Sequence, residues 1–399
     1  MFSSLSVRSF RVYWLGMLVS LIGTWIQQVA LSWLVFELTN SVLLLGIVGF
    51  LGSIPILILS LFGGILADRL NKRNILITTQ VIFMCLAFTL AILTQLKLIT
   101  PYQIMAIAVL NGVVMAFDAP ARQSIVIELV GKANLFNAIA LNSVAFNSSR
   151  IIGPALAGIL VAGIGMSGCF YINGISFLAV IVALYSIRTG HLHIPVKSQG
   201  AFRDLIDGLN FIRNNRLILA LIGIVGVVSL FGVAHVVLMP VFANDILNVG
   251  IKGLGVLMSA AGAGALFGAL ILARLGDFKY KGKLLISSAM AFSLSLVVFS
   301  LSKNYFLSIF ALILVGFSSV TAIALVNTLL QTKVEDRFRG RVMSVFMITF
   351  AGMMPFGNLI AGGLAHTMGV SFAVMFGGII CALFFTAVSF LFPSIAKIN

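Results

Sequence analysis

The chain has 399 residues, of which 61% are hydrophobic and 9% are charged, with a mean hydropathy of +1.17 and a net charge of +15. Soluble domains carry about 25% charged residues, so this composition excludes an ordinary soluble domain and predicts a chain that crosses the membrane several times. The basic residues are scattered in short segments between apolar runs, which argues against a nucleic-acid partner. The three cysteines have no disulfide or zinc spacing, and neither a metal site nor a cofactor is predicted.

The chain starts with a membrane span rather than a cleaved signal peptide, because Arg8 and Arg11 precede an apolar run without an A-x-A-like cleavage site. We expect an all-α membrane protein, since charge-poor runs of about 20 residues recur throughout the sequence. These runs predict twelve transmembrane helices at about 12–36, 42–67, 75–96, 102–121, 136–163, 168–187, 217–241, 254–273, 284–302, 305–328, 342–365 and 369–392.

The distribution of basic residues predicts the orientation of these spans. If both termini are cytoplasmic, the cytoplasmic segments hold 21 of the 25 Lys and Arg residues. The outer loops hold only Lys97, Lys252 and Lys303, and Arg150 alone lies inside a span. The positive-inside rule therefore favours cytoplasmic termini.

The longest loop divides the twelve spans into two sets of six. We expect an N-terminal bundle at 1–187, a cytoplasmic linker at 188–216 and a C-terminal bundle at 217–399. The linker contains AFRDLIDGLNFIRNN, in which apolar residues recur at helical spacing with charges opposite them. This pattern is typical of a helix on the membrane surface, and we interpret it as a tether without a site of its own. Its apolar residues are Phe202, Leu205, Ile206, Leu209 and Ile212.

A charged turn, GGILADRLNKRN at 63–74, follows the second span. It could simply be the polar stop between two spans, but its pattern resembles the loop between helices 2 and 3 of the major facilitator superfamily. Asn71 stands where that family has a glycine, and asparagine is the non-glycine residue that best adopts positive φ. The resemblance implies that Gly64 permits close helix contact. It also implies that Asp68, with Arg69 and Arg73, latches the cytoplasmic side.

The two halves of the chain contain similar sequence motifs, as expected for the two six-helix bundles of that superfamily. The charged turn returns in weakened form at 273–283, where Asp277 corresponds to Asp68. The sequence RIIGPALAG of the fifth span likewise matches MMPFGNLIAGG of the eleventh. Parallel repeats of this kind place a substrate site near the midplane between the halves and imply alternating access.

The fifth span also resembles the G-P-x-x-G-G element of proton-coupled exporters, with Gly153, Pro154 and Gly158 on matching positions. Proline removes a backbone hydrogen bond and bends a helix, while small residues allow close packing. The element therefore either bears on the direction of transport or is only a packing kink.

Arg150 lies about halfway along the fifth span, where an unpaired charge costs several kcal/mol. One interpretation is an ion pair with Asp118, and the other is a fixed positive charge for an anionic substrate. The aligned place in the eleventh span holds the apolar Ala351, which favours the ligand. Amides at comparable depth complete the predicted substrate site, namely Asn147, Gln27 and Gln28.

Asp118 begins the string FDAPARQ, which resembles a motif of one exporter branch of the superfamily. That branch includes the enterobactin exporter and many predicted drug exporters. Other strings that fit the branch are GTWIQQVALSWLVFELT, NSSRIIGPALAG, MPVFANDILNVG and RGRVMSVF with PFGNLIAGG. Asp118 is either a proton carrier, because burial favours the neutral carboxyl group, or the partner of Arg122 one helical turn on, at the cytoplasmic gate.

Three further features have both a functional and a structural interpretation. Glu37 is either a solvated cap at the end of the first span or a proton-coupling group. His235 in the seventh span either titrates during transport or is a hydrogen-bonded structural residue. The run EDRFRGR at 335–341 resembles a gate segment of the second half, although a solvated charged loop would have the same composition.

The sequence contains no catalytic constellation and no phosphate-binding loop, so we predict no enzyme and no ATP-driven pump. We expect a secondary transporter in a bacterial inner membrane, with protons, membrane lipid and a small-molecule substrate as partners, acting as a monomer. The favoured function is proton-coupled export of an amphipathic or anionic compound, such as a siderophore or a drug-like molecule. The alternatives are an importer of a siderophore or nutrient with the same fold, and a non-transporting membrane sensor or scaffold.

Overall fold

The computed structural model describes residues 3–187, 201–276 and 278–396, with the side chains at 68, 132, 201–205, 394 and 396 left out. Throughout the described residues the chain is helical, without strands. It divides into two compact units. The first unit comprises Met1–Ser41, Leu51–Val196 and Gly250–Ser259, and the second comprises Val42–Phe50, Lys197–Val249 and Ala260–Asn399.

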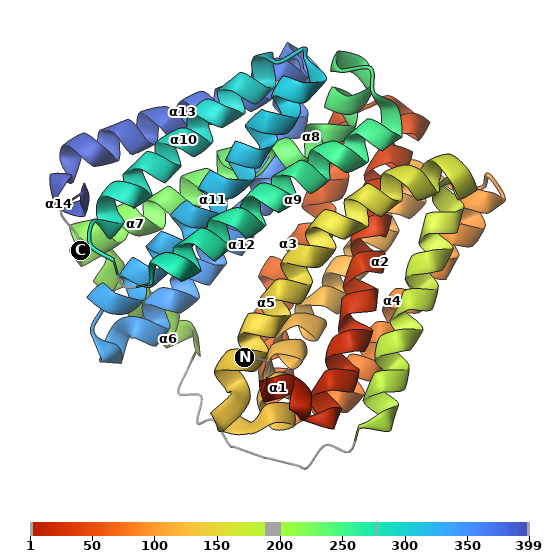
Figure 1. The fold of residues 1–399 in the computed structure, drawn as a ribbon, viewed down its shortest axis with the longest axis horizontal. Coiled ribbons are helices and arrows are strands. Elements are labelled where there is room, and N and C mark those ends of the chain that lie inside the picture. The colour runs from red at the N-terminus through yellow and green to blue at the C-terminus, as the bar shows by residue number, and fades with distance from the viewer. Residues whose placement is uncertain (1–2, 188–200, 277, 397–399) are drawn as a thin grey trace. The chain divides into compact units, whose positions relative to one another are not determined.

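Figure 1 shows the helices of the described residues. In chain order they are α1 (Ser3–Ser6), α2 (Arg8–Thr39), α3 (Val42–Arg69), α4 (Lys72–Gln95), α5 (Pro101–Ser186), α6 (Ala201–Asn214), α7 (Arg216–Val227), η1 (Val228–Gly232), α8 (His235–Val241), η2 (Phe242–Ile246), α9 (Gly250–Leu275), α10 (Lys281–Leu301), α11 (Tyr305–Lys333), α12 (Asp336–Met368), α13 (Val370–Leu391) and α14 (Pro393–Ala396).

Eleven helical stretches of the described residues are long and apolar enough to cross a membrane, which confirms the expected all-helical, multi-span fold. The longest stretch, Ala133–Ser186, has 54 residues and covers both the fifth and the sixth expected spans. Gly165 interrupts it with a φ of 74° and a ψ of 175°. Glycine adopts such a conformation readily because it has no Cβ, so the chain reverses there without a separate loop.

Two helical stretches run beyond the expected span ends. The fourth span was expected to end at about 121, but the helix continues to Gly131 and so includes Arg122. The charge of Arg122 is paired there with Asp118. The seventh span was expected to stop at 241, but the π-helix η2 extends the helical stretch to Ile246.

Asn71 does not use the positive φ that asparagine can adopt. Its φ of −66° and ψ of 112° are extended, and its side chain accepts hydrogen bonds from the backbone N–H groups of Arg73 and Asn74. Asn71 is therefore the N-cap of α4, which satisfies two amide groups in the first helical turn. Thr100, Asn215 and Asn304 cap α5, α7 and α11 in the same way.

In the first unit, α2 and α4 pack along α5 (Figure 1). Buried side chains from all three helices form one cluster, which includes Phe10, Tyr13, Leu76, Ile125 and Leu184. Glycines permit the closest helix contacts, because a Cβ added at Gly63 would overlap the backbone of Ala116 in α5. The expected close contact at Gly64 is not found in the described part of the chain, since an added Cβ there would meet no atom within 4 Å.

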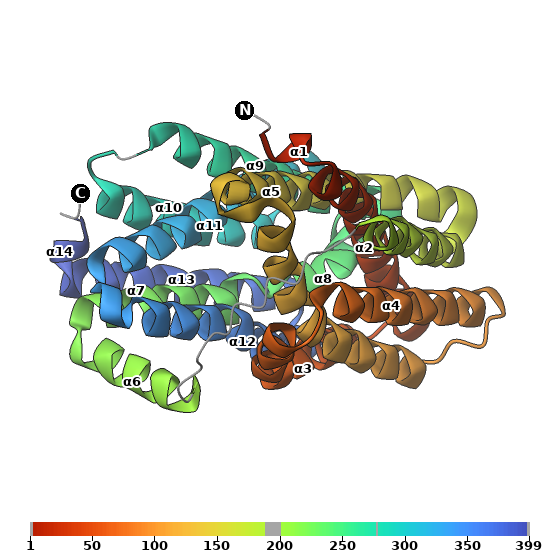
Figure 2. The same cartoon turned by 90° about the horizontal axis from the view of Figure 1, so that it is seen from below.

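In the second unit, α10 packs against α11 and α13, and Figure 2 shows α6 running alongside α12 at the edge of the unit. The predicted apolar face of α6 is divided. Ile212 is buried, whereas Ile206 and Leu209 are exposed. The side chains of Phe202 and Leu205 lie outside the described residues. The linker helix is therefore packed on α12 through one side and leaves an apolar strip uncovered.

The fifth and eleventh spans make equivalent helix contacts, each within its own unit. A Cβ at Gly255 of α9 would overlap the carbonyl oxygen of Pro154 and lie close to Gly158. A Cβ at Gly46 of α3 would likewise meet the carbonyl oxygen of Asn358 and the Cα of Gly362. Gly158 and Gly362 therefore occupy equivalent positions in the two halves. Arg150 lies eight residues before Gly158, and Met354 lies eight residues before Gly362, so Arg150 corresponds to Met354 and not to Ala351. Met354 is apolar, as Ala351 is.

Candidate functional site

A buried carboxylate, Asp118, organises the polar residues at the centre of the first unit. Its side chain is only 1% exposed. Oδ1 accepts hydrogen bonds of 2.8 Å from the Thr79 hydroxyl and the Gln80 amide of α4. Oδ2 accepts from Nε of Arg122 at 2.9 Å and lies 2.8 Å from its Nη2. Both carboxylate oxygens are thus engaged, and the charge is neutralised one helical turn away.

Three atoms around this ion pair have no hydrogen-bond partner among the described residues, although they are buried. They are the hydroxyl of Tyr13, Oε1 of Gln80 and Nη1 of Arg122. Nη1 belongs to the guanidinium of the pair, Gln80 donates to Asp118, and Tyr13 lies near both charges. A buried polar atom without a partner costs about 1–3 kcal/mol, so these three atoms distinguish the surroundings of the ion pair.

Arg150 is half-buried in α5 and makes no hydrogen bond or ion pair with any described residue. The alternative in which it pairs with Asp118 is wrong, because Asp118 holds Arg122 instead. The hydroxyl of the preceding residue, Ser149, is buried and also without a partner in the described part of the chain. A guanidinium within a span that lacks a protein counter-charge is a feature of substrate and ion pathways.

The predicted amides, of which Asn147 lies in α5 and Gln27 and Gln28 lie in α2, do not form one network among the described residues. Gln27 accepts a 2.8 Å hydrogen bond from the Nδ2 of Asn173, and Asn147 donates to the carbonyl oxygen of Ser143 at 2.8 Å. Gln28 is exposed. Trp25 of α2 packs against Phe146 with ring centroids 6.0 Å apart, which holds α2 beside the helix that carries Arg150.

Asn173 is a buried polar residue that sequence reasoning missed. It is 1% exposed and contacts Ser176 as well as Gln27. A Cβ at Gly23 would collide with these side chains, so the polar contact needs glycine at that place in α2. The signal in the sequence was the presence of two polar residues, Asn173 and Ser176, within the apolar run YINGISFL.

The other two predicted proton-coupling groups have local structural partners. Glu37 is exposed and accepts a 3.0 Å hydrogen bond from the indole N–H of Trp33. His235 is buried, with its Nδ1 at 2.6 Å from the carbonyl oxygen of Gly232. That oxygen lies at the end of the π-helix η1, so the contact joins η1 to α8.

The charged turn after α3 is fastened to its own unit. Arg73 donates from Nε to the carbonyl oxygen of Leu184 at 2.6 Å and from Nη2 to that of Tyr185 at 3.2 Å. A cation at these carbonyls complements the negative C-terminal end of α5. Lys72 pairs with Glu128 at 2.5 Å, a contact that sequence reasoning missed. Arg69 is exposed, and Asp277 and the Asp68 side chain lie outside the described residues.

The glycines of the fifth span are packing positions. A Cβ at Gly153 would overlap Trp25 of α2, and one at Gly158 would meet the backbone of Ile251 and Lys252. Next to Pro154, the Ser259 hydroxyl of α9 donates a 2.7 Å hydrogen bond to the carbonyl oxygen of Ile151. The element thus brings α2 and α9 close to α5, as the packing interpretation requires, and its bearing on transport direction stays a prediction.

The sequence pattern that defines the transmembrane secretion effector family of the major facilitator superfamily matches residues 1–398. The chain is 27% identical to the staphyloferrin A transporter of Staphylococcus aureus, over 90% of this chain and 91% of the relative. It is 24% identical to macrolide efflux protein A of Streptococcus pyogenes, over 93% of each chain. It is also 24% identical to the enterobactin exporter EntS of Citrobacter koseri, over 90% of this chain and 86% of the relative.

Among solved structures, a variant of the nucleoside transporter NupG superimposes with a TM-score of 0.75. The alignment covers 97% of this chain and 99% of that one at 15% identity. The likeness shows the fold.

Proposed function

Because the chain belongs to the transmembrane secretion effector family of the major facilitator superfamily, we propose that it exports an amphipathic or anionic small molecule by proton-coupled alternating access. The names of its relatives refer to staphyloferrin A, enterobactin and macrolides, which favour a siderophore or drug-like substrate. A twelve-span chain with cytoplasmic termini, acting as a monomer in a bacterial inner membrane, is part of the same proposal.

The observation that carries the proposal is the isolated guanidinium of Arg150. A charge in a span is expensive unless it is compensated, and no described residue compensates this one. A substrate carboxylate, catecholate or phosphate would do so while bound, through charge-assisted hydrogen bonds. Asn147 on the same helix, and Gln27 and Gln28 on α2, supply neutral donors and acceptors.

Proton coupling is assigned to the ion pair of Asp118 and Arg122. A proton that binds Asp118 cancels the charge that holds Arg122, and the unpartnered atoms of Tyr13 and Gln80 offer the released groups other hydrogen bonds. Protonation therefore breaks the ion pair and also changes the hydrogen bonds by which Thr79 and Gln80 of α4 hold Asp118 of α5. Glu37 and His235 are weaker candidates because local bonds already explain them.

The role of Arg150 is tested by substituting it with alanine or lysine in purified protein reconstituted into liposomes. We expect Arg150→Ala to reduce transport of anionic compounds at least tenfold while neutral macrolide-like compounds are less affected, because a charge-assisted pair contributes about 1.5–3 kcal/mol. Arg150→Lys keeps the charge and should recover part of the rate. The matched control is Arg8→Ala, which removes an exposed arginine at the start of α2. Equal rates for anionic compounds in Arg150→Ala and Arg8→Ala would contradict the assignment.

A further inference from the structure

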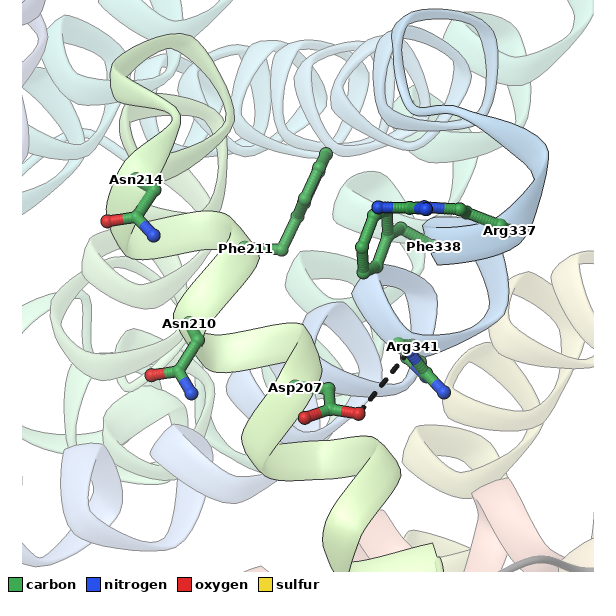
Figure 3. A pocket seen from close by; sticks show the side chains of 7 residues that line it. All are labelled: Asp207, Asn210, Phe211, Asn214, Arg337, Phe338 and Arg341. Carbon is green, nitrogen blue, oxygen red and sulfur yellow. Dashed lines mark ion pairs between the residues drawn. The ribbon is translucent and has the colours of Figure 1, made fainter.

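An open groove of about 670 Å³ lies between the linker helix α6 and the start of α12 (Figure 3). Its lining consists of Asp207, Asn210, Phe211, Asn214, Arg337, Phe338 and Arg341. The α6 residues of this set recur at helical spacing, so they form one face of that helix. Arg337, Phe338 and Arg341 belong to the segment 335–341, and no lining residue is among those proposed to bind substrate or protons.

Specific contacts hold the two walls of the groove together. The rings of Phe211 and Phe338 are stacked, with centroids 4.3 Å apart and an interplanar angle of 20°. The carboxylate of Asp207 lies 3.4 Å from Nη1 of Arg341. Gly208 allows this approach, because a Cβ there would come within 3.1 Å of the Arg341 carbonyl oxygen. These contacts between α6 and α12 fix the shape of the groove within the second unit.

The chemistry of the groove suits an anion. The guanidinium of Arg337 lies over the Phe338 ring at 4.4 Å, and its side chain is 76% exposed. Its one carboxylate neighbour, Glu335, is 3.7 Å away and 71% exposed, which is a weak pair. Across the groove, Asn210 and Asn214 make no hydrogen bond within the described residues, so their amide groups are available (Figure 3).

The surroundings of the groove suit a lipid. Ile206 and Leu209 on α6 are 43% and 48% exposed, which is an apolar strip on the helix that forms one wall. Asn215 caps α7 directly after α6 ends, so the groove lies where a membrane span begins. Leu219 continues the exposed apolar surface into that span. A polar groove beside apolar side chains at the end of a span matches a phospholipid, whose headgroup and acyl chains are contiguous.

We propose that this groove binds the phosphate headgroup of an anionic phospholipid of the inner leaflet. Arg337 binds the phosphate oxygens, the asparagine amides on the other wall contact the rest of the headgroup, and Ile206 and Leu209 contact the acyl chains. The assignment to the inner leaflet depends on the cytoplasmic orientation of the linker, which is part of the proposed function. The binding of an anionic phospholipid does not depend on that orientation. A lipid in this place contacts both walls and ties α6 to α12.

The test uses the purified full chain in a neutral detergent, with thermal unfolding and native mass spectrometry as readouts. Phosphatidylglycerol should raise the unfolding temperature of the wild type and remain bound, whereas phosphatidylcholine should do neither. Arg337→Gln should weaken phosphatidylglycerol binding about fivefold, the effect of one basic group at a lipid surface. Asn210→Ala with Asn214→Ala should weaken it without changing charge. The matched control is Arg274→Gln, which should bind as the wild type does.

Two results would overturn the proposal. One is equal phosphatidylglycerol binding by Arg337→Gln and Arg274→Gln. The other is the same stabilisation by inorganic phosphate alone, which would identify the groove as a site for soluble anions. Because binding is measured in detergent without a gradient, failure of the export proposal would leave this result unaffected.

Discussion

At the scale of single residues, the buried ion pair of Asp118 and Arg122 is the most informative group in the structure. The four-residue spacing predicted that the two side chains meet, and the pair is present. Thr79, Gln80 and Tyr13 could not be assigned to it, because α2, α4 and α5 meet only in the folded protein. The isolation of Arg150 was equally inaccessible, since the sequence left Asp118 available to either arginine.

Removing the carboxylate alone should destabilise the protein. Asp118→Asn leaves the Arg122 guanidinium in a buried place without a counter-charge, which costs about 3–5 kcal/mol. Asp118→Asn combined with Arg122→Gln removes both charges and should recover most of that stability. In reconstituted liposomes the double variant should exchange substrate across the membrane at a near-normal rate, yet respond little to a pH gradient.

The control for this prediction is Glu37→Gln, which removes an exposed carboxylate and should leave gradient-driven transport unchanged. If the folded double variant still follows a pH gradient as the wild type does, Asp118 is a structural residue and the proton binds elsewhere.

At the scale of helices, periodicity and charge predicted that spans exist but not where each one ends. The helix expected to end at about 121 continues to Gly131 and so includes Arg122. Asn71, which stands in place of the family's glycine, caps α4 with an extended backbone. The close contact expected at Gly64 falls at Gly63. Such details depend on which face of a helix meets its neighbour, and a one-residue change turns a side chain by about 100°.

Close helix packing at the fifth span gives a matched pair of substitutions. Gly158→Val would force its side chain into the backbone of Ile251 and Lys252 and should destabilise the protein by about 1–3 kcal/mol. Gly163→Val lies five residues further along the same helix, where an added Cβ meets no atom within 4 Å. Thermal unfolding of the two variants in detergent measures the difference. Equal unfolding temperatures would show that the contact between α5 and α9 is not tight in the protein.

At the scale of the whole molecule, composition was sufficient to predict a helical membrane protein, and the motifs were sufficient to predict its superfamily. The repeat between the fifth and eleventh spans was also visible in the sequence. The helix contacts, however, match Arg150 with Met354 rather than with Ala351. The groove beside α6 was missed because helical periodicity shows an apolar face but not which part of it a neighbour covers. The domain boundaries at 187 and 216 and the site residues remain predictions.

The central claim is proton-coupled export, and transport into inverted membrane vesicles tests it most directly. When the interior of the vesicles is made acidic, the pH gradient has the direction that drives efflux from a cell. Vesicles that contain the protein should then accumulate an anionic siderophore or a macrolide against the concentration gradient of that compound. Collapse of the pH gradient should abolish that accumulation. Accumulation that persists without the gradient, or net movement of the compound in the opposite direction, would contradict the account.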